Sequence, residues 1–91
     1  MTLLIEVVDS PGCAKCKVAK EVTRRVASQY KGVEYRELNV LSNPERIVEL
    51  GVLITPTIAM NGEIVLTKTP REEELKARVE ELLKGEGDAS D

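Results

Sequence analysis

The feature that most constrains this chain is a pair of cysteines, Cys13 and Cys16, placed shortly after an apolar run at residues 3–8. Only Glu6 interrupts that run, and a nearly continuous apolar strand is typical of the centre of a sheet that is covered on both faces. The residues that follow favour a helix, so the cysteines lie at a strand-to-helix junction. Two sulfurs at this spacing can approach across one helical turn and open or close a disulfide, which indicates a redox motif.

The rest of the chain alternates between helical and strand patterns at short intervals. Residues 13–30 predict a helix, because Val18, Val22 and Val26 recur every four residues and Lys31-Gly32 follows as a stop. The further predicted elements are a strand at 33–40, a short helix at 43–51, strands at 57–60 and 63–67, and a helix at 69–85. This order, β-α-β-α-β-β-α, predicts an α/β fold in which a mixed four-stranded sheet is flanked by three helices on its two faces.

Residues with special backbone preferences mark the ends of these elements. Asn43-Pro44 predicts a helix start with Asn43 as its cap, and the segment from Thr69 to Glu72 matches a capping box. Asn61-Gly62 is typical of a tight hairpin turn, and we expect nothing more of it. Gly85 predicts the end of the last helix, so we expect one domain at residues 1–85 and a short, flexible acidic tail at 86–91.

Composition narrows the possible partners. The chain has 91 residues and a net charge of -3, whereas general nucleic-acid binding needs a basic surface. No apolar stretch approaches the ~20 residues of a membrane span, and the N-terminus lacks the basic head and cleavage site of a signal peptide. We therefore expect a cytoplasmic monomer that binds neither nucleic acid nor membrane and whose disulfide is transient.

The helix treats the two cysteines differently. Cys13 lies at the helix start, where unpaired N–H groups and the helix dipole favour a negative charge, so we expect the pKa of its thiol to lie below the ordinary ~8.5. Lys15 and Lys17 add positive charge and are predicted to stabilise the thiolate. In helical projection, Cys16 falls at the margin of the apolar arc that includes Val18, and Cys13 falls some 60° outside it. Cys13 is therefore predicted to be the nucleophile and Cys16 the resolving thiol.

Over nearly all of residues 1–84 the chain resembles small thioredoxin-fold proteins of glutaredoxin-like size. The motifs that carry the resemblance are Cys13-x-x-Cys16, Leu38-Asn39-Val40 with Asn43-Pro44, Gly51-Val52, Thr55-Pro56-Thr57 and Asn61-Gly62-Glu63. It implies a redox-active disulfide that needs no cofactor or metal. It also implies that Pro56 is a cis-proline facing the disulfide, the alternative being an ordinary trans turn. Gly12, Thr55 and Pro56 are then expected to bind the substrate, Thr55 through its backbone.

These features predict a thiol–disulfide oxidoreductase that reduces or exchanges disulfides. The Cys13 thiolate would attack a substrate disulfide, and Cys16 would then displace the substrate thiol from the mixed disulfide. The expected substrates are disulfide-containing proteins or small thiol compounds, and an upstream reductase or a small thiol would reset the pair. The alternative is a protein that binds a soft metal, or senses redox state, through its thiolates without turnover.

The chain also departs from the family it resembles. Val7 occupies the place of the buried acid that lies six residues before the first cysteine, which leaves Glu6 and Asp9 as candidate proton acceptors for Cys16. The Gly-Gly-x-x-Asp segment that holds glutathione in glutaredoxins is missing. The residues that share the helical stripe of Cys13, either a solvated face or a docking patch for acidic partners, are Lys17, Lys20 and Arg24.

Overall fold

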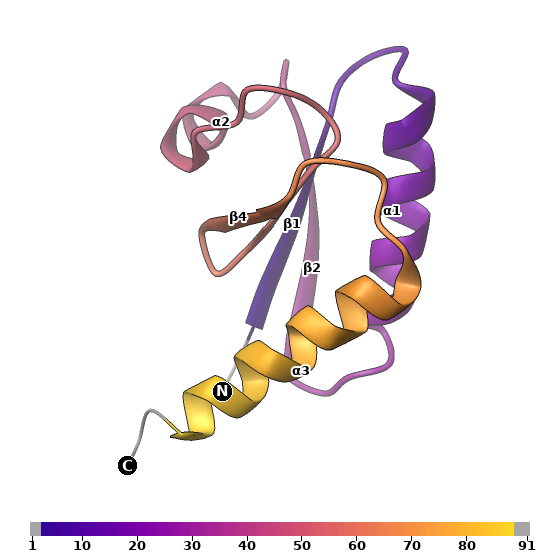
Figure 1. The fold of residues 1–91 in the computed structure, drawn as a ribbon. Coiled ribbons are helices and arrows are strands. Elements are labelled where there is room, and N and C mark those ends of the chain that lie inside the picture. The colour runs from indigo at the N-terminus through magenta and orange to yellow at the C-terminus, as the bar shows by residue number, and fades with distance from the viewer. Residues whose placement is uncertain (1–2, 89–91) are drawn as a thin grey trace.

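Helices and strands alternate in the computed structural model, which describes residues 3–88. The elements are β1 (Leu3–Asp9), α1 (Ala14–Ala27), β2 (Val33–Asn39), α2 (Pro44–Leu50), β3 (Thr57–Met60), β4 (Glu63–Leu66) and α3 (Glu72–Asp88). The strands form one sheet in the order β2-β1-β3-β4, in which β1 and β2 are parallel and the other neighbouring pairs are antiparallel. The predicted α/β class and mixed four-stranded sheet with three helices are confirmed (Figure 1).

Strand β1 is internal to the sheet and contributes to a separate apolar core on each face. Its residues Leu3, Ile5 and Val7 pack with the buried side chains of α1 and α3. Val8 packs on the other face with Leu50 of α2. Because side chains alternate between the faces of a strand, the continuous apolar run in the sequence reflects burial on both sides.

The sheet topology brings three connections to one end of the molecule. Strands β1 and β2 are parallel, so both lead into their following helices at the same edge of the sheet. Strand β3 begins at that edge, because Thr57 pairs with Val8 near the end of β1. The β1–α1 connection and the segment that leads into β3 therefore lie close together (Figure 1).

The β3–β4 hairpin turns at Asn61-Gly62, as predicted. Both residues have positive φ, 51° and 83°, as the favoured two-residue hairpin turn requires. The expectation that these residues do nothing more is wrong. The Asn61 side chain accepts a hydrogen bond from the Leu4 amide at 2.9 Å, and the Asn61 amide donates to the Leu4 carbonyl at 2.8 Å. Asn61 therefore also ties the hairpin to β1.

The first two helices differ from prediction at their ends. Helix α1 ends at Ala27 rather than near Tyr30, because the Tyr30 amide bonds to the Ala27 carbonyl in a tighter turn. Helix α2 begins after Asn43 and ends at Gly51 as predicted, but the Asn43 side chain does not cap it. The Asn43 side chain accepts a hydrogen bond from the Asn39 amide at 3.1 Å instead.

Helix α3 begins at Glu72, so the predicted capping box at Thr69 is wrong. The Glu74 carboxylate accepts a hydrogen bond from the Arg71 amide at 3.1 Å, and this bond caps the helix two residues later than expected. The helix also continues through Gly85 and Gly87 to Asp88, since each glycine in a helix costs only about 1 kcal/mol. The rest of the predicted tail, residues 89–91, lies outside the described residues.

Candidate active site

Cys13 and Cys16 lie at the junction between β1 and α1 and are joined by a disulfide, with their Cα atoms 5.3 Å apart. Cys13 has an extended backbone and is the N-cap of α1. Its sulfur accepts a hydrogen bond from the Cys16 amide at 3.1 Å, which satisfies one of the N–H groups left free at a helix start. The same N–H group and the helix dipole would favour a thiolate at Cys13 when the disulfide is open.

The two sulfurs differ in their access to solvent. Cys13 is half-buried, whereas Cys16 is only 1% exposed. The inward-facing side of α1 includes Val22 and Val26 as predicted, but not Val18, which is 47% exposed. The buried residues of the helix are Cys16, Ala19, Thr23, Val26 and Ala27. The arc is rotated away from Val18, so Cys16 lies within the buried face rather than at its margin.

The segment before β3 approaches the cysteine loop through a hydrogen bond between two hydroxyl groups. Ser10 Oγ and Thr55 Oγ1 are 2.7 Å apart although they are 45 residues apart in the chain. The Thr55–Pro56 peptide bond is cis, and Pro56 is buried. Sequence reasoning misses Ser10 as a site residue, because nothing in the sequence distinguishes it from any other loop serine.

Three further predicted site residues surround the pair. Gly12 is exposed and has a φ of 75°, a backbone conformation that favours glycine. Lys15 and Lys17 are exposed, and neither forms an ion pair with another described residue. Lys17 lines a shallow hollow together with Gly12 and Cys13.

The two candidate proton acceptors lie on opposite faces of the sheet. Glu6 points to the α2 face, where both of its carboxylate oxygens bind Arg46, at 2.7 and 3.0 Å. The sheet therefore separates Glu6 from Cys16, and the geometry argues against it as the proton acceptor. Asp9 lies on the α1 face and forms an ion pair with Lys20 at 2.7 Å. Chiefly through that hydrogen bond, Asp9 raises the pKa of Lys20 above its ordinary value.

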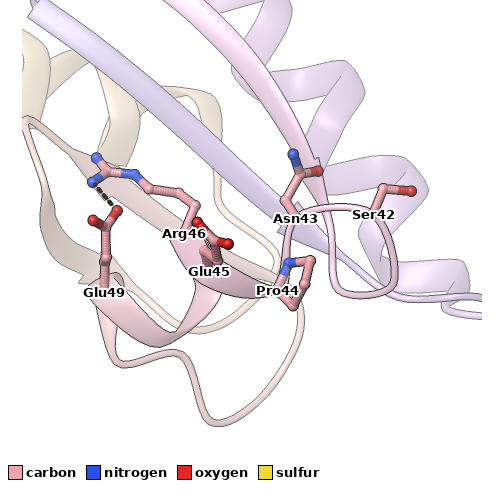
Figure 2. A pocket seen from close by; sticks show the side chains of 6 residues that line it. All are labelled: Ser42, Asn43, Pro44, Glu45, Arg46 and Glu49. Carbon is pink, nitrogen blue, oxygen red and sulfur yellow. Dashed lines mark hydrogen bonds and ion pairs between the residues drawn. The ribbon is translucent and has the colours of Figure 1, made fainter.

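A second hollow lies beside α2 and contains neither cysteine. It is lined by Ser42 to Arg46 and by Glu49, and Figure 2 shows the Arg46 and Glu49 side chains pointing toward one another. Among the described residues, no three histidine, cysteine or acidic side chains gather as they would around a metal ion. None of the described helices has the length and apolar character needed to cross a bilayer.

Comparison with known proteins identifies the family. A family model described as a thioredoxin domain matches residues 3–80. A thioredoxin of Methanocaldococcus jannaschii is 35% identical over 80 residues, which cover 87% of this chain and 94% of the relative. A probable thioredoxin of Methanothermobacter thermautotrophicus is 30% identical over 76 residues, which cover 82% of this chain and 89% of the relative.

Solved structures show the same fold. Thioredoxin-2 of the malaria parasite superposes with a TM-score of 0.75 at 15% identity, covering 88% of this chain and 82% of that structure. A mutant thioredoxin of Halobacterium salinarum gives a TM-score of 0.74 at 22% identity, covering 86% of this chain and 72% of that structure. The family relationship favours redox chemistry over the soft-metal alternative. The chain belongs to the thioredoxin family and is a thiol–disulfide oxidoreductase with a redox-active disulfide between Cys13 and Cys16.

Proposed function

We propose that this chain reduces disulfides in proteins, with Cys13 as the attacking thiolate and Cys16 as the resolving thiol. The observation that carries the assignment is the difference in access: Cys13 is half-buried at the helix N-cap, whereas Cys16 is 1% exposed beneath it. A nucleophile must reach a sulfur on another molecule, but a resolving thiol needs to reach only the sulfur of its neighbour. The hydrogen bond from the Cys16 amide to the Cys13 sulfur supports a stabilised thiolate at Cys13.

The cycle consists of two exchange steps that move two electrons to the substrate. In the first, the Cys13 thiolate attacks one sulfur of the substrate disulfide; that S–S bond breaks, a mixed disulfide forms and the other substrate sulfur leaves as a thiolate. In the second, Cys16 loses its proton and attacks the Cys13 sulfur, which releases the second substrate thiolate and closes the Cys13–Cys16 disulfide. An upstream reductase or a small thiol then returns the pair to the dithiol form. We place this cycle in the cytoplasm, where a catalytic disulfide is transient.

The residues around the pair are assigned supporting roles in the same proposal. Thr55 pairs through its backbone with an extended substrate segment, and Pro56 and Gly12 border the place where the substrate disulfide is attacked. The hydrogen bond between Ser10 and Thr55 supports this assignment, because it holds the segment before β3 against the cysteine loop. The positive charges of Lys15 and Lys17 favour the thiolate form of the attacking sulfur.

The test is an insulin-reduction assay with dithiothreitol as the reductant, using Cys13→Ser and Cys16→Ser as matched variants. We expect both substitutions to abolish turnover, and only Cys16→Ser to accumulate a mixed disulfide with a model disulfide peptide, detected by intact-mass spectrometry. Turnover that survives both substitutions would remove the enzymatic proposal. Equal trapping by the two variants would contradict the assigned roles while leaving the redox activity in place.

A further inference from the structure

A hollow beside Pro56 is not used by the exchange steps themselves. It has a volume of about 440 Å³ and is lined by Lys15 of α1, by residues 54–56 before β3 and by residues 67–69 after β4. That volume lies in the range of sites that hold a small ligand or a large side chain. In Figure 1, the connection between β4 and α3 (orange) runs toward α1 at the same end as the cysteine loop.

The charged groups of this hollow are predominantly positive, although the whole chain is acidic. Lys15 is exposed and has no ion-pair partner among the described residues. Lys68 Nζ lies 3.1 Å from the Glu74 carboxylate, which also binds the Arg71 side chain at 3.5 Å. Arg71 has a second, exposed partner in Glu73 at 3.7 Å. Within the part of the chain that the structure describes, the hollow itself is therefore lined by two lysines and no carboxylate, and the unpaired Lys15 leaves a positive charge beside the redox pair.

The uncharged residues that line the hollow can contact both the carboxylate and the aliphatic part of an acidic side chain. Thr67 and Thr69 line it, and a threonine hydroxyl can donate to a carboxylate alongside a lysine ammonium. Ile54, which is 55% exposed, offers an apolar wall for the aliphatic part of the substrate, and the adjacent Leu53 is 94% exposed.

We propose that this hollow selects protein substrates in which an aspartate or glutamate lies next to the reacting cysteine. The proposal rests on the proposed function and names its substrate class. Lys15 is two residues from Cys13, and the hollow includes Thr55 and Pro56. A substrate segment whose sulfur reaches Cys13 therefore places a neighbouring side chain over the hollow. Since each exposed ion pair contributes modestly, two lysines together account for about a three- to tenfold preference in kcat/KM.

The experiment uses three peptides that contain the same intramolecular disulfide and differ only at the residue beside one cysteine, which is Glu, Gln or Lys. The kcat/KM for reduction of each peptide is measured with the full chain and with Lys68→Gln, Lys15→Gln and the double variant. Lys31→Gln is the matched control, because Lys31 is an exposed lysine that does not line the hollow. For each variant, the kcat/KM for the Glu peptide is divided by the kcat/KM for the Gln peptide, so any effect of Lys15 on thiolate reactivity cancels.

We expect the parent and Lys31→Gln to prefer the Glu peptide by about three- to tenfold at low salt, and the Lys peptide to be the poorest substrate. The double variant should lose the preference, and about 0.5 M NaCl should weaken it in the parent because exposed charges are screened. The inference is overturned if the kcat/KM for the Glu peptide equals that for the Gln peptide in the parent, or if the ratio of the two is unchanged in the double variant. In either case, reduction of all three peptides leaves the proposed function intact. If no peptide is reduced, the proposed function fails, and the inference fails with it.

Discussion

Replacing Arg46 with methionine should destabilise the fold by about 3 kcal/mol, because it leaves a buried carboxylate without its partner. The Glu6 side chain is 1% exposed, and both of its oxygens bind the Arg46 guanidinium, at 2.7 and 3.0 Å. Glu6 and then Glu49 hold the pKa of Arg46 above its ordinary value, so Arg46 remains charged throughout the accessible pH range.

The magnitude follows from the burial of the pair. Removing one partner of a buried ion pair costs about 3–5 kcal/mol. The lower end applies here, because the Arg46 side chain is 35% exposed and water can reach the space that it leaves. A chain of 91 residues has a total stability of about 5–14 kcal/mol. For a urea m-value of about 1.5 kcal/mol/M, the unfolding midpoint should therefore fall by about 2 M.

Two control variants separate the buried charge from other effects. Glu49→Gln removes the exposed partner of Arg46, which lies 3.2 Å away, and should change stability by less than about 1 kcal/mol. The double variant Glu6→Met/Arg46→Met should be more stable than Arg46→Met alone, because no unpaired charge remains.

The assay is urea unfolding followed by circular dichroism, with insulin reduction measured on the same samples. A stability loss below about 1 kcal/mol in Arg46→Met would refute the argument from burial. Because Glu6 and Cys16 lie on opposite sides of the sheet, Glu6→Gln should reduce insulin at the parental rate per folded molecule. Loss of exchange in a folded Glu6→Gln variant would show that this assignment of faces does not exclude Glu6 from the chemistry.

Three further outcomes follow from single contacts. Ser10→Ala and Thr55→Val should each lower the free energy of unfolding by about 1 kcal/mol and slow insulin reduction. Because the two side chains share one hydrogen bond, their effects on stability should be non-additive in a double-mutant cycle, and additive effects would contradict this. Asp9→Asn should lower the free energy of unfolding by about 1 kcal/mol at pH 7, because it removes the ion pair with Lys20. The raised pKa of Lys20 means that this stabilisation is present below pH 10.5 and is lost as the pH rises through the raised pKa, so the difference between Asp9→Asn and the parent should shrink at high pH. A difference that stays constant to about pH 12 in chemical unfolding would contradict this. The pKa of Glu74 is lowered chiefly by the Arg71 backbone amide at the start of α3, so the Glu74 carboxylate stabilises the fold at neutral pH. Glu74→Gln should therefore lower the Tm at pH 7, and the difference in Tm from the parent should vanish as the pH falls well below 4.5. An equal difference in Tm at about pH 2.5 would contradict this.

The features of the fold that the sequence predicts correctly are those that depend on residues adjacent to one another in the chain. The hairpin at Asn61-Gly62 requires two consecutive residues with positive φ, and few residue pairs supply them. The apolar run of β1 indicates burial on two faces, and the order of helical and strand patterns along the chain predicts the α/β class. Helix ends are harder to predict because tertiary contacts decide among several local solutions. Thr69 is a better candidate cap than Arg71 in the sequence, and only the structure shows that Glu74 binds the Arg71 amide.

The candidate site divides in the same way. Cys13 and Cys16 can be identified from the sequence because their chemistry depends on a spacing of three residues. The hydrogen bond between the Ser10 and Thr55 hydroxyl groups joins residues 45 apart, and its existence depends on the antiparallel pairing of β3 with β1. The side of the sheet on which Glu6 lies likewise depends on which helix covers which face of β1. A strand flanked by apolar residues on both faces does not reveal this in its sequence.

Net charge and local charge have opposite signs in this protein, and only local charge acts on an approaching substrate at short range. The chain carries -3 overall, but many of its carboxylates lie along α3 or within ion pairs, whereas Lys15 and Lys17 are exposed beside the cysteines. At physiological ionic strength, exposed charges separated by more than ~8 Å are largely screened. An acidic substrate is therefore repelled only weakly by carboxylates beyond this distance. The nearby Glu74 is already paired with Lys68, so the unpaired Lys15 attracts the substrate. For this reason an acidic chain can prefer acidic substrates, and the peptide series with the Lys15 and Lys68 variants tests that preference directly.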